Sequence, residues 1–400
     1  MKTITENLVT PVTEKYDVVV AGGGVAGIAA ALAAARQGAK VCLLEKLFML
    51  GGLGTAGLVT IYLPICDGRG TQVSFGLAEE LLRLSICHGW EKDYPAAWLE
   101  NGTSEEKTKR RFMVQYNAQL FAIAAEQLLL QEGVKILYGT SVTSVAMEDD
   151  KITAVIVENK SGRSAIEVKS VVDATGDADV CMQAGENTAL FKTKNVMPAW
   201  YYSIGAMGYK LNMLGYVELT DEMKTEEQKL KSQSLRHFQG IDGDEISEMV
   251  CLSHEEILRD VVKKRADDAE YLPVTIATTP QLRMTRRLEG LYTMTMEDDR
   301  ADFPDSIGMV GNWRTRGPVY EVPFRCLYGN RISNLITAGR CISANDPMWD
   351  VMRVIPCCAV TGEAAGVAAA ISDNFKSLDV GLLQKKLKEC GVKLFYKDLI

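Results

Sequence analysis

Runs of apolar residues near the start of the chain predict a strand, a helix and a second strand. Residues 16–21 (YDVVVA) form a short apolar run rich in β-branched side chains, which is typical of a buried strand. After a glycine-rich turn, an alanine-rich segment extends to about residue 37 and predicts a helix, with Gly38 as its C-terminal cap. Residues 40–45 (KVCLLE) are the next predicted strand. The three elements make one β–α–β unit.

The hydrophobic pattern of the remaining chain predicts both helices and strands. Residues 244–266 carry apolar residues at helical spacing, whereas residues 221–237 are charged nearly all round and predict an exposed helix. Short strands with turn signals between 141 and 173 predict an antiparallel meander. The order of elements predicts an α/β fold with a parallel central sheet. Further helices are predicted at 113–132, 356–372 and 380–390, and further strands at 134–138, 319–324 and 332–338.

Composition and charge narrow the class of protein. The chain of 400 residues is 47% hydrophobic and 24% charged, which is typical of a globular protein of two or three domains. Its net charge of −8 argues against nucleic acid or an anionic membrane as a partner. Ten cysteines are too few for a disulfide scaffold, no zinc-ligand spacing is present, and the first residues lack the apolar run of a signal peptide. We therefore expect a cytoplasmic protein without a bound metal, in which the uncharged stretch 18–35 is a strand, turn and helix and not a membrane span.

The turn between the first strand and helix carries a dinucleotide-binding fingerprint. Gly22, Gly24 and Gly27 give the pattern GxGxxG in the context that it requires, after a strand and at the start of a helix. The first glycine makes the tight turn, the second lets the backbone approach a pyrophosphate, and the third lets helix and strand pack closely. The helix N-terminus then offers free N–H groups to the diphosphate. Glu45, at the end of the second strand, is placed to accept hydrogen bonds from an adenosine ribose, and an acid there disfavours NADP.

Two later strands end in small residues. Residues 171–176 (VVDATG) and 335–340 (LITAGR) each continue an apolar run into a glycine. A dinucleotide binds at the carboxyl edge of a parallel sheet, so such ends allow a long cofactor to lie across them.

The sequence resembles the FAD-dependent oxidoreductase family with a glutathione-reductase-type nucleotide fold, and it is most similar to a branch grouped with the heterodisulfide reductases, without their iron–sulfur clusters. The resemblance implies a Rossmann-like FAD-binding domain with an inserted β-meander, a mixed substrate/cap domain, and FAD as the cofactor. No histidine lies near residues 46–60, so we expect the FAD to be noncovalently bound. The segments that carry the resemblance are 18–46, 51–59, 171–180, 320–343 and 353–370.

The resemblance also implies roles for individual residues. Gly52 and Thr55 would lie near the diphosphate or flavin, and Val142 would present its backbone to adenine. Residues 356–362 would begin a helix aimed at the flavin pyrimidine ring, where a helix N-terminus stabilises negative charge. The residues implied to bind FAD are Gly22, Gly24, Val25, Ala26, Gly27, Glu45, Lys46, Gly52, Thr55, Val142, Ala174, Thr175, Gly176, Gly339, Arg340, Pro356 and Gly362.

Some features of related flavoproteins are missing from this sequence. No cysteine pair follows the first β–α–β unit, which disfavours a flavin disulfide reductase. A second GxGxxG after a strand is absent, so no NAD(P)H domain is visible. There is also no cysteine quartet for an iron–sulfur cluster.

Two arginines are the candidate catalytic residues. Arg353 precedes the helix expected to face the flavin and is placed to anchor an anionic substrate, with an ion pair to Asp346 or Asp350 as the alternative. Arg286, in the cluster QLRMTRRLEG, is a candidate to point at the flavin, with a structural role as the alternative. The aromatic run Trp200, Tyr201 and Tyr202 is a candidate to stack on a substrate, with core packing as the alternative.

Together these features predict a flavin-dependent oxidoreductase. A small organic substrate would be held against flavin N5, a hydride would pass between them, and the electron acceptor or donor is unknown. The alternatives are an electron-transfer flavoprotein subunit of a larger complex and a flavoprotein with structural FAD. We expect a discontinuous FAD-binding domain and a substrate/cap domain, at 14–63, 113–190 and 318–400 and at 64–112 and 191–317, respectively.

Overall fold

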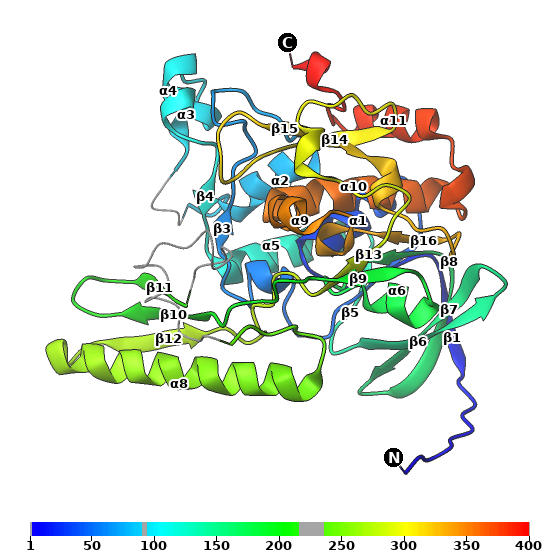
Figure 1. The fold of residues 1–400 in the computed structure, drawn as a ribbon, viewed down its shortest axis with the longest axis horizontal. Helices are drawn as coiled ribbons and strands as arrows, with labels where there is room; N and C mark the ends of the chain where they lie inside the picture. The colour runs from blue at the N-terminus through cyan, green and yellow to red at the C-terminus, as the bar shows by residue number, and fades with distance from the viewer. Residues whose placement is uncertain (1, 90–93, 216–235, 400) are drawn as a thin grey trace.

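A seven-stranded sheet forms the centre of the molecule. The computed structural model describes residues 2–89, 94–215 and 236–399. The strands of the sheet are β1 (Val12–Ala21), β2 (Val41–Leu44), β5 (Lys135–Leu137), β6 (Ser141–Glu148), β7 (Lys151–Asn159), β8 (Gly162–Asp173) and β16 (Leu335–Thr337). Their order is β5–β2–β1–β8–β7–β6, with β16 also paired to β8 (Figure 1). β5, β2, β1, β8 and β16 are parallel, whereas β6, β7 and β8 form an antiparallel meander. The predicted α/β fold is confirmed.

The register of the parallel strands aligns their carboxyl ends. Ala21 of β1 pairs with Leu44 of β2 on one side and with Asp173 of β8 on the other. Asp173 in turn pairs with Thr337 of β16. The first part of β8 pairs with β7 and its last three residues pair with β16, so this one strand joins the meander to the parallel sheet. Four strands therefore end in one row.

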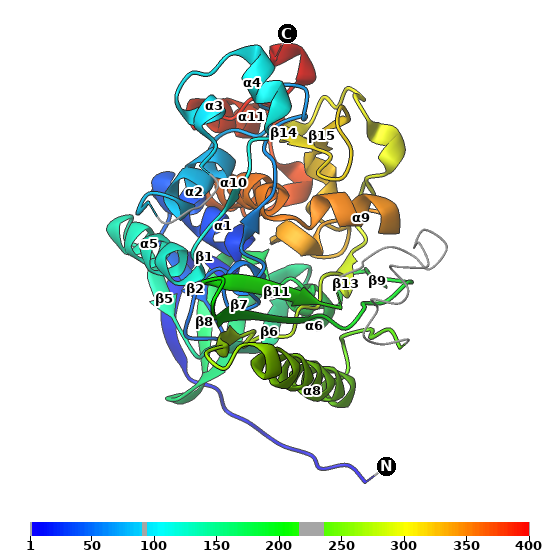
Figure 2. The ribbon, with the colours of Figure 1, turned by 90° about the vertical axis from the view of Figure 1, so that its left-hand side faces the viewer.

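Two helices pack against each other in the layer beside this sheet. These two are α1 (Val25–Arg36) and α10 (Ile355–Ile371). The other α-helices in the described residues are α2 (Leu77–Ser85), α3 (Ala96–Leu99), α4 (Ser104–Lys109), α5 (Ala118–Gln131), α6 (Asp179–Ala184), α8 (Gly243–Asp267), α9 (Asp346–Met352) and α11 (Val380–Glu389). α1 and α10 lie side by side in both views (Figures 1 and 2). A Cβ atom on Gly362 or Gly366 of α10 would overlap the carbonyl oxygens of Ala26 and Ala30 of α1. Glycine and alanine therefore let the two helices run parallel with their backbones in contact.

The apolar helices are too short to span a membrane one at a time. Among the described residues no single helix is both long and apolar enough to cross a membrane. α9 and α10, which meet at 87°, have the required length and composition only when they are taken together.

A second, three-stranded sheet lies beside the first. It has the order β11–β10–β12, with β10 (Ala199–Ile204), β11 (Lys210–Leu214) and β12 (Leu272–Ile276). α8 covers this sheet, and its Ile257 and Val261 pack on Tyr201 (Figure 1). The prediction of a helix at 244–266 is confirmed, and Asp242 caps it by accepting a hydrogen bond from the Glu245 N–H at 2.9 Å.

Within the described residues, the other strands form three short antiparallel pairs. These are β3 (Ile61–Tyr62) with β4 (Val114–Gln115), β9 (Thr188–Leu190) with β13 (Arg286–Leu288), and β14 (Ser306–Gly311) with β15 (Val319–Pro323).

One predicted helix starts later than its apolar pattern indicated. The helix expected at 113–132 begins at Ala118, because Val114 and Gln115 are used as strand β4. The Asn117 side chain accepts hydrogen bonds from the N–H groups of Gln119 and Leu120, which fixes the start of α5. The helix predicted at 221–237 falls outside the described residues except for its last two positions.

Candidate active site

A cavity of about 610 Å³ lies at the carboxyl edge of the central sheet. Because four strands end in register, the residues that follow them reach the same edge. Gly22, Glu45, Ala174 and Ala338, which follow β1, β2, β8 and β16, all line this cavity. This is the edge at which the sequence predicted a dinucleotide.

The glycine-rich turn brings backbone N–H groups to the cavity. Gly22 has a φ of 102°, which a residue with a side chain rarely adopts, and a Cβ on Gly27 would overlap the Gly22 carbonyl oxygen. Gly24 caps α1 without a side-chain hydrogen bond, and no atom lies within 4 Å of the position of its Cβ. Gly27 therefore serves close packing, whereas Gly24 leaves open space in front of the helix N-terminus. This cradle fits a diphosphate.

Glu45 is bound to the turn that it faces. Its carboxylate accepts hydrogen bonds from the N–H groups of Gly23 and Leu47 at 2.8 and 2.7 Å, and the residue is 5% exposed. Each carboxylate oxygen has a second lone pair, so a ribose hydroxyl can also donate to it. Glu45 thus both fixes the loop and presents an acceptor to the cavity.

We predict that Glu45→Ala weakens FAD binding by about tenfold or more, because a hydrogen bond to a charged group contributes roughly 1.5–3 kcal/mol. Equilibrium titration of the FAD-free protein with FAD measures this change. The melting temperature of the FAD-free protein reports the separate loss of the bonds to Gly23 and Leu47. Glu167→Ala is the matched control, since that half-exposed carboxylate pairs with Lys15 outside the cavity wall. Equal affinities of the Glu45→Ala and control proteins would refute the ribose contact.

Asp173 holds the turn that follows β8. Its side chain is fully buried and accepts hydrogen bonds from the Thr175 N–H at 3.1 Å and from the Thr175 hydroxyl at 2.6 Å. It also accepts one from the Cys181 N–H at 2.9 Å, at the start of α6. Residues 174–176 are consequently presented to the cavity on a rigid turn.

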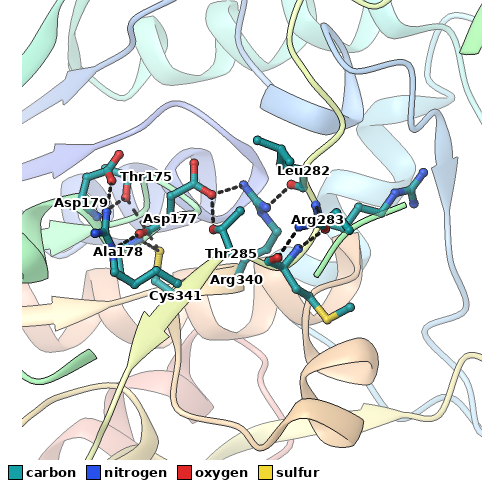
Figure 3. A network of polar contacts seen from close by, with 12 residues as sticks. Thr175, Asp177, Ala178, Asp179, Leu282, Arg283, Thr285, Arg340 and Cys341 are labelled. Carbon is teal, nitrogen blue, oxygen red and sulfur yellow. Dashed lines mark hydrogen bonds and ion pairs between the residues drawn. The ribbon is translucent and has the colours of Figure 1, made fainter. Parts of the chain in front are cut away.

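Arg340 connects this turn to the chain that follows β12 of the second sheet. Its guanidinium donates to the Leu282 carbonyl and lies 3.4 Å from the Asp177 carboxylate. A Cβ on Gly176 would overlap the same guanidinium. Figure 3 shows Arg340 between Asp177 and Leu282, with the Arg283 side chain extending away from it. Arg340 thus joins two walls of the cavity.

Most of the predicted cofactor residues lie on the cavity wall, and the others are not part of the wall. Thr55 donates its hydroxyl hydrogen to the Leu50 carbonyl, and Gly362 packs on α1. The predicted residues on the cavity wall are Gly22, Gly24, Val25, Ala26, Glu45, Lys46, Gly52, Val142, Ala174, Thr175, Gly176 and Arg340. Those not on the wall are Gly27, Thr55, Gly339, Pro356 and Gly362.

The geometry does not support a catalytic role for Arg286. Its guanidinium donates to the Asp177 carbonyl at 3.0 Å and to the Asp179 carboxylate at 2.7 Å, and the residue is not on the cavity wall. Arg286 belongs to β13, whose pairing with β9 turns it toward α6. Arg283, three positions earlier, lines the cavity instead.

The part of the wall away from the glycine-rich turn is aromatic and basic. Trp200 of β10 and Trp313, which follows β14, both line the cavity. The sequence pointed to Trp200, but Trp313 lies in a polar stretch with no recognisable pattern. We call this part the cap end of the cavity and define it by Trp200, Thr278, Thr279, Pro280, Arg283, Trp313 and Arg353.

Cys358, on the first turn of α10, lines the cavity as a buried thiol. Burial raises its pKa to about 11, against the opposing charges of Arg340 and Arg353. It is therefore a thiol and not a nucleophilic thiolate at neutral pH. Within the described residues, no group of three or more His, Cys, Asp or Glu side chains could hold a metal ion.

Comparison with known families identifies one that matches nearly the whole chain. The family described as FAD dependent oxidoreductase matches residues 17–197 and 187–387. The similarity to the heterodisulfide reductase branch stays a prediction.

Individual proteins match shorter parts of the chain. Thioredoxin reductase from Ureaplasma parvum is 37% identical over 73 residues, which are 18% of this chain and 24% of that protein. NADH:fumarate oxidoreductase from Klebsiella pneumoniae is 27% identical over 189 residues, 41% of this chain and 20% of that protein. The chain thus spans a quarter or less of the length of these two curated relatives. Among solved structures, p-nitrophenol 4-monooxygenase from Pseudomonas putida has a TM-score of 0.49 and 13% identity, covering 94% of this chain and 84% of that one.

Proposed function

The chain belongs to the FAD-dependent oxidoreductase family and has FAD as its cofactor, and we propose that it exchanges a hydride between a small organic substrate and noncovalently bound FAD. One observation carries this proposal. The cavity extends without interruption from the glycine-rich turn to the cap end, so the same space has room for a dinucleotide at one side and a substrate at the other.

The residues of the nucleotide side would hold the adenosine and the diphosphate. The N–H groups of the first turn of α1 would bind the diphosphate in front of Gly24. Glu45 would accept from the ribose hydroxyls, and residues 140–142 would lie against the adenine. Asp173 and Arg340 act through the turn at 174–176, which they keep in place.

α10 would support the flavin side. Gly362 of α10 packs on Ala26 of α1, but α10 begins seven residues before this contact and α1 begins one residue before it. At 1.5 Å per residue, the N-terminus of α10 therefore extends about 9 Å farther than that of α1. The two helices would thus act on different parts of one cofactor. The N-terminal N–H groups of α10 favour negative charge on the ring that they face.

The cap end would position the substrate and exclude water. When bound, FAD supplies the group that accepts or donates the hydride. Trp200, Trp313 and the chain at 278–283 would enclose the reacting groups on the side opposite to the sheet. We propose the boundaries 191–317 and 64–112 for the cap. Wall residues come from 191–317, whereas the described part of 64–112 contributes none and packs through α2 against α10.

The proposal is tested by following the visible spectrum of the bound flavin without oxygen. Holoenzyme is mixed with a panel of hydroxy acids, carboxylic acids, amines, sugars and steroids, and bleaching of the oxidised flavin is recorded. Because the direction of the reaction is open, dithionite-reduced holoenzyme is mixed with the same panel and with unsaturated acids, and reoxidation is recorded. We expect saturable bleaching or reoxidation with at least one compound, and none with the FAD-free protein.

Two outcomes would favour the alternatives. If dithionite reduces the flavin and no small molecule exchanges electrons with it, an electron-transfer subunit accounts better for the protein. Should neither dithionite nor any compound change the flavin spectrum, the FAD is structural and the proposed function is wrong.

A further inference from the structure

Two arginines at the cap end are buried against indole rings. Arg283 is 5% exposed, its guanidinium carbon lies 4.9 Å from the centre of the Trp200 ring, and it donates to the Gln281 side-chain oxygen at 2.9 Å. The Gln281 amide in turn donates to the Gly57 carbonyl. Arg283 is thus held by the loop that follows the first β–α–β unit.

Arg353 lies in the same surroundings on the other side of that loop. It occupies the bend between α9 and α10, which meet at 87°, and its side chain is 6% exposed. The guanidinium carbon is 5.8 Å from the centre of the Trp313 ring, and the guanidinium lies 2.9 Å from Asp350. Ile355, two residues later, lies 3.5 Å from the Cβ position of Gly54. Loop residues 54–57 therefore contact Gln281 and Ile355, each two residues from one of the arginines.

The carboxylate beside Arg353 stays ionised and is shared. Asp350 also pairs with Arg314. Although burial opposes ionisation, Arg353 and Arg314 lower the pKa of Asp350 below its usual range. This arrangement fixes the direction of the Arg353 side chain, which remains part of the cavity wall.

Charge is distributed unevenly along the cavity wall. In the described part of the chain, the nucleotide side of the wall carries charges of both signs. They are Glu45, Lys46, Asp177, Asp179 and Arg340, and all the acidic wall residues are among them. At the cap end the charged wall residues are Arg283 and Arg353. A substrate that enters the cap end therefore meets two guanidinium groups and two flat indole rings.

Building on the proposed function, we propose that the substrate is an organic acid that binds through its carboxylate. The planar fork of a guanidinium matches a carboxylate with two parallel hydrogen bonds. Trp200 and Trp313 add apolar surface to the same part of the wall, which suits the carbon skeleton of such an acid. A neutral amide would lose the charge-assisted hydrogen bonds, and an amine could not accept them.

The test compares two probes of the same shape, benzoate and benzamide, on the FAD-loaded enzyme. Binding is followed through the visible spectrum of the flavin and through tryptophan fluorescence. We expect saturable binding of benzoate that is about tenfold or more tighter than that of benzamide. Arg283→Gln and Arg353→Gln should each weaken benzoate by about tenfold and leave benzamide within about twofold. Arg283→Lys and Arg353→Lys should restore part of the affinity.

Arg259→Gln is the matched control. Arg259 lies on α8, its side chain is 63% exposed, and it pairs with Glu255 and Glu256, so its loss should change neither probe. FAD content and melting temperature are measured for every variant. A variant that keeps its FAD and its melting temperature reports on the probe alone. If Arg353→Gln releases FAD, the test rests on the benzoate affinity of the Arg283 variants. An unchanged benzoate affinity in these variants overturns the inference.

Equal affinity for benzoate and benzamide would overturn the inference, as would variants that weaken both probes alike. These results are separable from those for the proposed function. Turnover of a neutral compound combined with equal probe affinities would remove the organic-acid inference and keep the hydride exchange. Charge-selective binding on a flavin that no compound reduces or reoxidises would keep the carboxylate site and remove the proposed reaction.

Discussion

Replacing Gly24 by alanine is expected to weaken FAD binding by about tenfold to a hundredfold and to leave the fold unchanged. The backbone of Gly24 has φ −66° and ψ 178°, which alanine adopts readily, and no protein atom lies within 4 Å of the new methyl group. The methyl group would instead occupy the space through which the diphosphate approaches α1. Overpacking by one such group costs roughly 1–3 kcal/mol. Titration of the FAD-free variant with FAD measures the affinity.

Gly27→Ala, three positions later, is expected to act mainly on the stability of the protein and not on the space for FAD. Its methyl group would overlap the Gly22 carbonyl oxygen in the packed interior, so the backbone itself must shift. We expect a loss of about 3 kcal/mol in the free energy of unfolding even without FAD. Denaturant unfolding of the two FAD-free variants provides the comparison. If Gly24→Ala destabilises the FAD-free protein as much as Gly27→Ala does, the separate roles of the two glycines are wrong.

The second large effect is on the pH dependence of stability and concerns Glu363 of α10. Glu363 is buried, and it accepts a hydrogen bond at 2.8 Å from the Leu77 N–H at the start of α2. Burial raises its pKa from 4.5 to about 8, Glu80 acts in the same direction, and the Leu77 N–H and Arg36 act against it. A neutral carboxyl group is therefore part of the folded state at neutral pH.

The sign of the effect follows from the raised pKa. The stability contributed by the protonated carboxyl group is fully present below pH 4.5 and is lost as the pH rises toward about 8. At pH 7 the accumulated loss is about 3 kcal/mol. Glu363→Gln removes this loss, so the variant should be more stable than the parent protein at pH 8 and nearly equal to it at about pH 4.5. Urea unfolding of both proteins at several pH values tests this. Parallel curves with a constant difference would show that Glu363 does not titrate in this range.

The local signals of the sequence select residues that the structure brings together at one end of the cavity. The fingerprint Gly22–Gly27 and the strand end at Glu45 depend on neighbours close in sequence, and the turn types and the helix start are encoded there. The family resemblance also implied contacts with FAD for residues that do not lie on the cavity wall. Gly339 and Gly362 match the family pattern because they allow elements to pack closely, and a sequence pattern does not separate such packing from direct contact.

The cap end was less predictable. β10 pairs with β12 across a long stretch of chain, and short strands of this kind are defined by their partners more than by their own residues. The basic cluster that holds Arg283 and Arg286 shows the same difficulty. Arg286 pairs in β13 with β9 and is not on the cavity wall, whereas Arg283 is on the wall, and the sequence of the cluster alone does not separate the two.

The contact between α1 and α10 has a consequence for how the protein is made. About 320 residues separate the two helices along the chain. At a synthesis rate of roughly 5–20 residues per second, the ribosome needs about 15–60 s to pass from one to the other. During this interval α10 has not yet been synthesised, so the apolar surface of α1 is without its packing partner. The cavity wall also lacks Arg353, Val354, Ile355 and Cys358. We therefore expect the chain to bind FAD only late in its synthesis. Protection of α1 by chaperones would matter most before α10 leaves the ribosome.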